Sequence, residues 1–459
     1  MDASIVAGAR PEPGRSSEAT LTGPPGRRSG ALSRAIDRAP ARAIPVILFS
    51  VACLVYLVFR PYWETLYIHF VFQADAWLHG RAAIEFPVPA PPHANDYYQD
   101  VLPLPDRYGF GLIPYPPLPA IVLLPFVAIF GMSAPQAFVG AVLGAANVVL
   151  AWRLTWRLSQ SRPVALAATL FFGFGTVAWY ASMIGSTWFF AHVVALGLTL
   201  LAVTVVLGDG GRRSRWSRLA GSSNGRLFVA GLLLGLAGLA RLTVVLGAPF
   251  LLLAGSGPPW RRALAVGLGI GIPVAALCAY NLASTGALFH PAYAYAAAAE
   301  LHPVPEFYHP DWGLEDLRYI PQNLFIALGL PPEVHTECGI GLFDPACGTL
   351  APNPLGMSVL LVSPAYLLAV PYAWRNLQRP VVLGAVLSIA TIGFANLAHF
   401  SQGWVQFGYR FSNDWAPFAL VLVTLAIARR GVDRLVVVLV AISVAVNLWG
   451  VYWGIMSGW

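Results

Sequence analysis

Long hydrophobic segments are the feature that most constrains the fold of this chain of 459 residues. Apolar runs close to the ~20 residues of a membrane-crossing helix recur along it. Hydrophobic residues make up 57 % of the chain and charged residues only 11 %, against about 25 % charged in soluble domains. Backbone groups in lipid must bond within their own segment, which favours helices. The sequence therefore predicts an all-α polytopic membrane protein.

One membrane domain, residues 41–459, is expected to follow the N-terminal segment 1–40. That segment is rich in Arg, Pro, Ser and Gly and lacks an apolar run. Such a composition buries too little apolar surface to offset the entropy of ordering. We expect a disordered cytoplasmic tail there.

About 11 transmembrane helices are expected. The run 227–254 is too long for one span and contains Gly238, Arg241 and Pro249, so it is expected to form two short helices, 227–240 and 242–254. The remaining predicted spans are 43–59, 136–157, 163–183, 185–207, 263–283, 355–373, 381–399, 414–428 and 435–453.

The proline-rich segment 114–131 is predicted to be re-entrant or interfacial. Its prolines remove helical hydrogen bonds, which is unfavourable for a helix exposed to lipid. If it crossed the membrane, the next arginine clusters, beginning with Arg153, would face outward, against the positive-inside rule. Treating it as non-spanning restores the bias in every later loop.

Charges sort onto opposite sides of the membrane in this topology. There is no lysine, and 22 of the 28 arginines fall inside with the N-terminus, whereas 15 of the 21 carboxylates fall outside. Arginines anchor the cytoplasmic ends of spans, which explains the net charge of +7 without a nucleic-acid partner. We expect a multi-pass protein of the plasma or inner membrane with a cytoplasmic N-terminus.

Two long external loops, 60–113 and 284–354, carry much of the polar chemistry. The first extracytoplasmic loop begins with apolar residues at helical spacing around Asp75, which predicts an amphipathic helix on the membrane surface. A carboxylate on its membrane-facing side would have a raised pKa and could act as a general base. The alternative is a solvated surface aspartate.

The external loop 401–414 is dense in aromatic and amide side chains around Arg410. A guanidinium beside the membrane can hold a lipid-linked phosphate with a charge-assisted fork. Alternatively, Arg410 pairs with Asp414 or reaches to lipid headgroups. Arg241, inside an apolar run at a cost of about 2.5–3.5 kcal/mol, lies beside a phosphate or pairs with an external acid. His192 is expected to be a hydrogen-bonded structural residue.

Cys338 and Cys347 lie in the second external loop, where they form a disulfide or remain two free thiols. The histidine and carboxylate spacings predict no metal site, and no Gly-rich nucleotide loop or serine-hydrolase motif is present in the sequence. No cofactor is therefore expected.

The order of these features resembles the GT-C superfamily of multispanning glycosyltransferases, such as protein O-mannosyltransferases and aminoarabinose transferases. An acidic residue in the first external loop, Asp75, comes first. The motifs that follow are Tyr115-Pro116-Pro117-Leu118, Phe130-Gly131, the basic helix end around Arg153 and Arg157, the Gly/Leu run 231–241, and the segment 403–411.

The resemblance implies transfer of a sugar from a polyprenyl-phosphate donor, within membrane lipids, to a lipid, glycan or protein acceptor at the extracytoplasmic face. Asp75 would be the general base and Arg410 would hold the donor phosphate. The other substrate-binding residues would be Arg241, Tyr409, Trp404, His69 and Tyr115. The alternatives are a lipid-linked sugar flippase or other transporter, and a non-catalytic relative of the enzymes.

Overall fold

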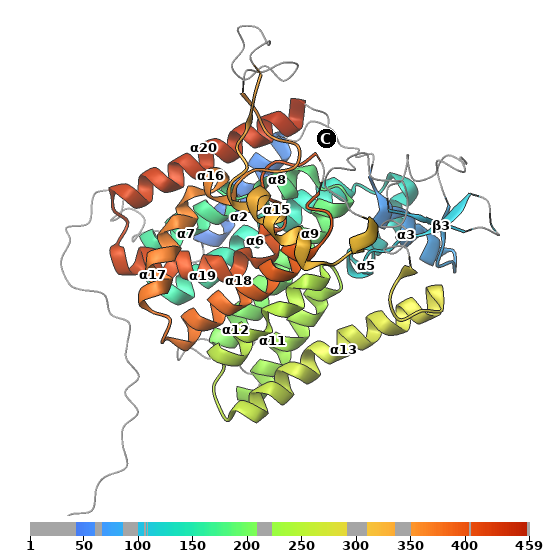
Figure 1. Cartoon of the computed structure of the whole chain (residues 1–459), viewed down its shortest axis with the longest axis horizontal. Coiled ribbons are helices and arrows are strands. Elements are labelled where there is room, and N and C mark those ends of the chain that lie inside the picture. The colour runs from blue at the N-terminus through green and yellow to red at the C-terminus, as the bar shows by residue number, and fades with distance from the viewer. Residues whose placement is uncertain are drawn as a thin grey trace, which may run out of the picture.

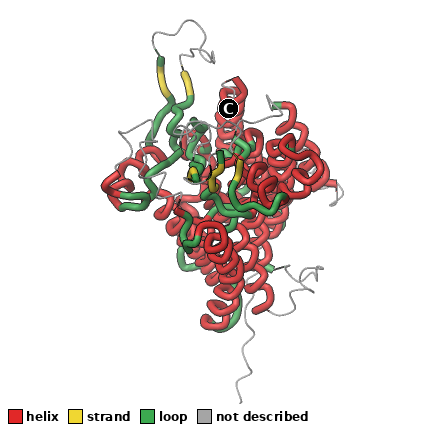
Figure 2. Tube along the Cα trace, turned by 90° about the vertical axis from the view of Figure 1, so that its right-hand side faces the viewer, coloured by secondary structure: helices red, strands yellow, loops and turns green. Residues whose placement is uncertain are grey.

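The computed structural model describes residues 43–59, 67–85, 100–104, 107, 109–208, 223–291, 310–335, 350–403 and 405–456. Helices pack side by side into one bundle, and the strands are short (Figures 1 and 2). The predicted tail 1–40, Trp404, Cys338 and Cys347 lie outside the described residues.

The first half of the chain forms the helices on which the bundle is built. Prolines at the first turns of α5 and α7 suit helix starts, because an N–H is not needed there. The elements are α2 (Ala43–Val58), α3 (His69–Leu78), α5 (Leu118–Phe130), η1 (Gly131–Ser133), α6 (Gln136–Ser159), α7 (Arg162–Phe174), α8 (Ala178–Ile184) and α9 (Thr187–Leu207).

The second half adds longer helices separated by short 3-10 turns. These are α11 (Ser223–Gly238), η2 (Leu242–Gly247), α12 (Ala248–Ala254), α13 (Pro259–Thr285), η3 (Pro310–Trp312), η4 (Leu317–Tyr319), α15 (Ile320–Leu328), α16 (Val359–Val362), η5 (Pro364–Leu368), α17 (Ala369–Arg375), α18 (Pro380–Ala398), α19 (Ser412–Arg430) and α20 (Arg434–Met456).

Two small antiparallel sheets lie in the segments that were predicted to be external loops. In the first, β3 (Phe110–Leu112) lies between β1 (Ile84–Glu85) and β2 (Leu102–Pro103), with Ile84 opposite Gly111 and Leu102 opposite Leu112. In the second, β4 (Glu333–Val334) pairs with β5 (Leu350–Ala351). The first sheet packs against α3 through Ile84, Val101 and Ile113.

Helix α19 is largely enclosed by the bundle, with nearly every residue from Ser412 to Ile427 buried. Helices α6, α7, α9, α17 and α18 surround it. This places the polar first turn of α19, including Asp414, deep between helices rather than at a surface. The bundle therefore has to satisfy that carboxylate internally.

Helix α13 packs on α11 through glycines that let the two backbones meet. A Cβ on Gly231 would lie 2.6 Å from the Val266 oxygen, and one on Gly269 would lie 2.4 Å from the Phe228 oxygen. Close approach through small residues is typical of membrane helix pairs. Much of the rest of α13 is exposed and apolar, including Leu268 and Ile272, and the helix extends beyond the bundle (Figure 1).

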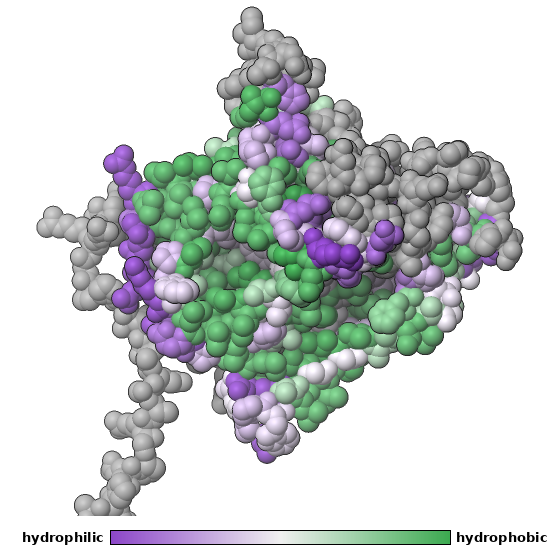
Figure 3. Space-filling view, viewed as in Figure 1, coloured by the Kyte–Doolittle hydropathy of each residue, from purple (hydrophilic) through white to green (hydrophobic). Residues whose placement is uncertain are grey.

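Within the described residues, five helices are long and apolar enough to cross a membrane, or six if the bent pair α7 and α8 counts as one span. These five are α6, α9, α13, α18 and α20. Apolar side chains cover much of the described surface in Figure 3, and polar ones gather along its left edge, at its lower tip and in a group near the centre. The predicted helical membrane class is confirmed, and the count of 11 spans stays a prediction.

Two predicted continuous spans are broken in the structure. The span 163–183 is divided into α7 and α8, which meet at a 48° bend where Tyr56 Oη donates to the Gly173 carbonyl. The span 355–373 is divided into α16, η5 and α17, because Pro364 cannot continue the hydrogen-bond ladder of α16. Apolar length alone does not reveal such breaks.

Other predicted segments are confirmed as helices. The run 227–254 is interrupted after Gly238, and 3-10 helix η2 leads into α12. The surface helix around Asp75 is α3. In the proline-rich segment, α5 has 13 residues, about 20 Å at 1.5 Å per residue, which is too short to cross a core of about 30 Å.

Candidate functional site

A buried ion network joins four segments of the bundle at Asp414. Arg241, in the turn between α11 and η2, donates from Nε to Oδ1 at 3.2 Å and from Nη2 to Oδ2 at 3.0 Å. Thr243 and Asn396 also donate to Oδ2, at 2.9 and 3.2 Å. His192 Nδ1 lies 2.8 Å from Oδ1. This network relieves the cost of burying both charges.

The contacts of Asp414 bear on the predictions for Arg410 and Arg241. Asp414 does not pair with Arg410, four residues before it, because α19 begins only at Ser412 and the two residues do not share a helical turn. Of the two alternatives for Arg241, pairing with an acid is the one observed. His192 lies beside Asp414, and its structural role stays a prediction.

The guanidinium of Arg410 lies beside the network but takes no part in it. Its central carbon lies 5.3 Å from the Phe411 ring centroid and 5.9 Å from that of Phe189. Arg241 stacks on the same Phe411 ring at 5.0 Å. Two cations therefore share one aromatic ring, and only one is neutralised by Asp414.

The backbone around Arg410 is shaped to receive its side chain. Gly403 has φ +99°, and a Cβ there would lie 2.6 Å from the guanidinium carbon of Arg410. The Arg410 Nε is buried and has no hydrogen-bond partner among the described residues. Burial, and then the charge of Arg241, lower the pKa of Arg410 to about 10, so it remains a cation at neutral pH.

Asp100, which the sequence did not single out, is a carboxylate held by Trp188, the residue before the Phe189 that Arg410 contacts. Its Oδ2 accepts hydrogen bonds from Tyr115 Oη and from Trp188 Nε1, the latter at 3.1 Å. The charges of Tyr115 and Asp100 favour the protonated form of Arg410 and so raise its pKa, against the larger effect of burial. Trp188 and Phe189 are consecutive residues in the first turn of α9, so α9 connects Asp100 to Arg410.

The other predicted substrate-binding residues are divided between this site and its supports. His69 is fully buried, and its Nδ1 lies 2.9 Å from Thr187 Oγ1. Its ring centroid is 5.7 Å from that of Tyr115 and 5.8 Å from that of Trp188, so it lies directly behind both Asp100 donors. Tyr409 is buried, with its ring 5.8 Å from Phe411. We refer to Asp100, Tyr115, Trp188, Phe189, Arg410 and Phe411 as the Arg410 site.

Asp75 lies elsewhere on α3. Its side chain is 24 % exposed and lies 3.5 Å from His79 Nδ1 and 3.9 Å from Arg81 Nη2. The buried side of α3 is formed by other residues, among them Phe70, Val71 and Ala74. Its surroundings are thus polar neighbours at a partly wet surface rather than the apolar contact expected from the helix pattern. Its role as a base stays a prediction.

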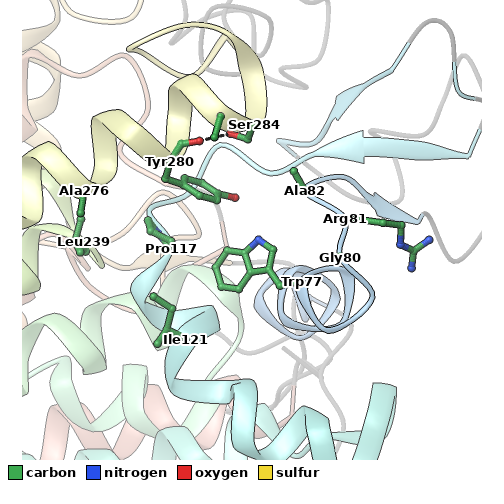
Figure 4. A pocket seen from close by; sticks show the side chains of 11 residues that line it. Trp77, Gly80, Arg81, Ala82, Pro117, Ile121, Leu239, Ala276, Tyr280 and Ser284 are labelled. Carbon is green, nitrogen blue, oxygen red and sulfur yellow. Dashed lines mark hydrogen bonds between the residues drawn. The ribbon is translucent and has the colours of Figure 1, made fainter.

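A pocket of about 530 Å³ lies between α3, α5 and α13 (Figure 4). Trp77 and Tyr280 pack edge to face in its wall with ring centroids 5.8 Å apart, and the Arg81 side chain points away from them. Gln73 donates to Tyr280 Oη at 2.5 Å. Most of the remaining wall is apolar, from Pro117, Ile121, Leu239, Ala276 and Ala283.

The pocket and the Arg410 site are neighbours along the chain. Leu118 N–H donates to the Leu239 carbonyl at 2.9 Å, which ties the start of α5 to the end of α11. Tyr115, which binds Asp100, comes three residues before Leu118. Arg241, which binds Asp414, comes two residues after Leu239. The α3 face that includes His69, Gln73 and Trp77 runs from the Arg410 site to the pocket, because residues four apart share a helix face.

Sequence reasoning missed Asp100, Trp188, Thr243 and Asn396. Asp100 is one of several acids in the first predicted loop, and no spacing distinguishes it. Its only local signal is a turn, since Asp tolerates the positive φ of 68° that it adopts. Thr243 and Asn396 are single polar residues in or beside apolar runs, where a hydrogen-bonding role is the general expectation.

Comparison with known proteins gives a likeness in structure alone. No family model and no curated protein sequence matches the chain. Among solved structures, it is similar to the archaeal oligosaccharyltransferase AglB from Archaeoglobus fulgidus in complex with an inhibitory peptide and a dolichol-phosphate, with TM-score 0.45, 12 % identity and 91 % of this chain covered. The apo form of the Archaeoglobus fulgidus oligosaccharyltransferase gives TM-score 0.44, 11 % identity and 90 % coverage. The chain spans 56 % and 55 % of the length of those two proteins.

Proposed function

We propose that this protein transfers a sugar from a polyprenyl-phosphate donor to an acceptor at the extracytoplasmic side of the membrane. The observation that supports this most is the Arg410 guanidinium, a cation packed against aromatic rings with a buried Nε and no ion pair among the described residues. A cation in such surroundings favours an anionic partner. A phosphate fits a guanidinium fork better than a single charge does.

The neighbouring Arg241 increases the attraction for an anion. Its Nε and Nη2 atoms are held by Asp414, so its position is fixed before any ligand arrives. Fixed donors lose little entropy on binding, which is the benefit of preorganisation. Arg410 would then contact the phosphate, and Arg241, which stacks on the same Phe411 ring, would contribute its field.

The pocket beside α3 supplies a place for an isoprenoid chain. Its volume of about 530 Å³ lies in the range of small-ligand sites, and it is walled by apolar side chains of α5 and α13. Both helices also expose apolar residues, such as Ile121 and Leu282, toward what would be lipid. A prenyl unit could therefore enter the pocket from the bilayer without crossing water.

In this proposal the protein stabilises a leaving group. As the bond between the sugar and the phosphate oxygen breaks, negative charge grows on the phosphate, and Arg410 holds that charge in a site of low polarity. The acceptor hydroxyl must lose its proton as it attacks, so a carboxylate at the extracytoplasmic face has to accept that proton. The aromatic residues beside the cations keep water from the departing phosphate.

Transfer by the purified protein tests the proposal. In liposomes that contain a radiolabelled polyprenyl-phosphate sugar and a membrane extract as the source of acceptor, we expect label to move to the acceptor. Arg410→Gln should raise the KM for the donor roughly tenfold to a hundredfold, because a hydrogen bond to a charged group contributes about 1.5–3 kcal/mol.

The matched control is Arg318→Gln. Arg318 is a second arginine predicted to be external, but it is 55 % exposed and paired with Asp316 at 2.9 Å. Its loss should leave donor use unchanged. Equal effects of the two substitutions would contradict the phosphate role of Arg410, and label that only crosses the bilayer, without transfer, would identify a flippase instead.

A further inference from the structure

We infer that Asp100, rather than Asp75, takes the proton from the acceptor hydroxyl in the Arg410 site. The inference rests on the proposed function and names a residue that the sequence motifs did not indicate. It is carried by three observations: the way the carboxylate is held, its position relative to Arg410, and the contrasting surroundings of Asp75.

The Asp100 carboxylate is oriented through one oxygen. Tyr115 Oη and Trp188 Nε1 both donate to Oδ2, and no donor among the described residues bonds Oδ1. The residue is partly exposed. A carboxylate fixed through one oxygen and free at the other is suited to accept a proton at the free oxygen.

The backbone at Asp100 is held in an uncommon conformation. Asp100 is one of three described non-glycine residues with positive φ, together with Gln160 and Val405. Such conformations persist where surrounding contacts determine them, and they are frequent at functional sites. Here the contacts are the two hydrogen bonds to Tyr115 and Trp188, with His69 packed behind both rings.

Asp100 and Arg410 each contact one of two consecutive residues at the start of α9. Trp188 binds Asp100, and the adjacent Phe189 lies under the Arg410 guanidinium. Asp100 acts on the charge of Arg410, yet the two form no ion pair in the part of the chain that the structure describes. A carboxylate and a guanidinium that contact neighbouring residues of α9, and form no ion pair with each other, are placed to act as base and cation on one bound group.

Asp75 lies in different surroundings on α3. Its nearest charged neighbours are His79 and Arg81, and Arg81 also contacts Glu85 at 3.3 Å. A base there would be paired with a surface arginine.

The proposed step balances. The acceptor hydroxyl gives its proton to Asp100 Oδ1 as its oxygen forms a bond to the anomeric carbon of the sugar. The bond from that carbon to the phosphate oxygen breaks, and its electron pair leaves with the polyprenyl phosphate, which Arg410 stabilises. Asp100 later releases the proton to water.

Asp100→Asn and Asp75→Asn form the matched pair of variants in the liposome transfer assay. Removal of a general base typically costs about 10²–10⁴-fold in rate. We expect a loss of this size in kcat for Asp100→Asn, with a donor KM close to that of the wild type, and a change within about threefold for Asp75→Asn. A large loss confined to Asp75→Asn would overturn the inference.

An anionic nucleophile separates a base from a structural residue. Azide attacks the anomeric carbon without losing a proton, so Asp100→Ala supplied with azide should form a glycosyl azide and release polyprenyl phosphate. If Asp100 only held the loop in place, the variant would lose donor binding and azide would restore nothing, which would overturn the inference. A wild-type protein without transfer would refute the proposed function itself, whatever the variants do.

Discussion

At the scale of single residues, Asp414 is the group on which the interior depends most. Asp414→Asn would leave the Arg241 charge buried without its counter-charge, and removing one partner of a buried pair costs about 3–5 kcal/mol. We therefore expect a clear fall in Tm, measured for the protein in detergent. The control Asp433→Asn breaks an exposed pair with Arg430, whose contribution should be about 1 kcal/mol or less. Equal Tm values for the two variants would refute the structural role of the network.

The residues of the site could be predicted only in part. The sequence identifies Arg241 and Arg410, because a cation in an apolar run or beside the membrane is unusual and costly. It does not identify the partner of each. Asp414 and Arg241 are 173 positions apart, and no local sequence pattern indicates a contact over such a separation. Asp100 could not be identified for the same reason, since its hydrogen-bond donor Trp188 lies 88 positions away.

At the scale of elements, the joint between α11 and α13 depends on glycine. We expect Gly269→Ala to lower Tm by an amount equivalent to about 1–3 kcal/mol, because overpacking forces a backbone shift. Gly267→Ala and Gly271→Ala are matched controls on the same helix, since a Cβ at either position meets nothing within 4 Å. These two should be neutral or slightly stabilising. A fall in Tm for all three would point to the helix itself and not to the joint.

Most helices could be predicted from apolar length, whereas their interruptions could not. Helices α6, α9, α13, α18 and α20 follow long apolar runs, and their bounds lie close to those expected. The bend between α7 and α8 and the division at Pro364 occur where tertiary contacts take over from the helical ladder. For example, Ala365 N–H, one residue after Pro364, donates to Ser443 Oγ of α20 at 3.2 Å. The hydrogen bond that replaces the helical one at this break thus comes from a helix far along the chain.

At the scale of the whole molecule, the predicted topology can be read by labelling. In a variant that lacks Cys53, Cys278, Cys338 and Cys347, a single cysteine replaces either Ser256, between α12 and α13, or Asp311. Both positions are exposed. A thiol reagent that cannot cross membranes should label the Asp311→Cys protein in intact cells. It should label Ser256→Cys only after permeabilisation, and the reverse pattern would invert the orientation.

The order of synthesis gives the Arg241–Asp414 pair a consequence for assembly. Arg241 leaves the ribosome 173 residues before Asp414, which at about 5–20 residues per second is roughly 10–30 s. If the segments enter the bilayer in that order, the turn between α11 and η2 carries an unpaired cation until α19 arrives. The last third of the chain then completes the folding of the middle third, and a truncated chain that ends before α19 would present the membrane quality-control machinery with an exposed arginine.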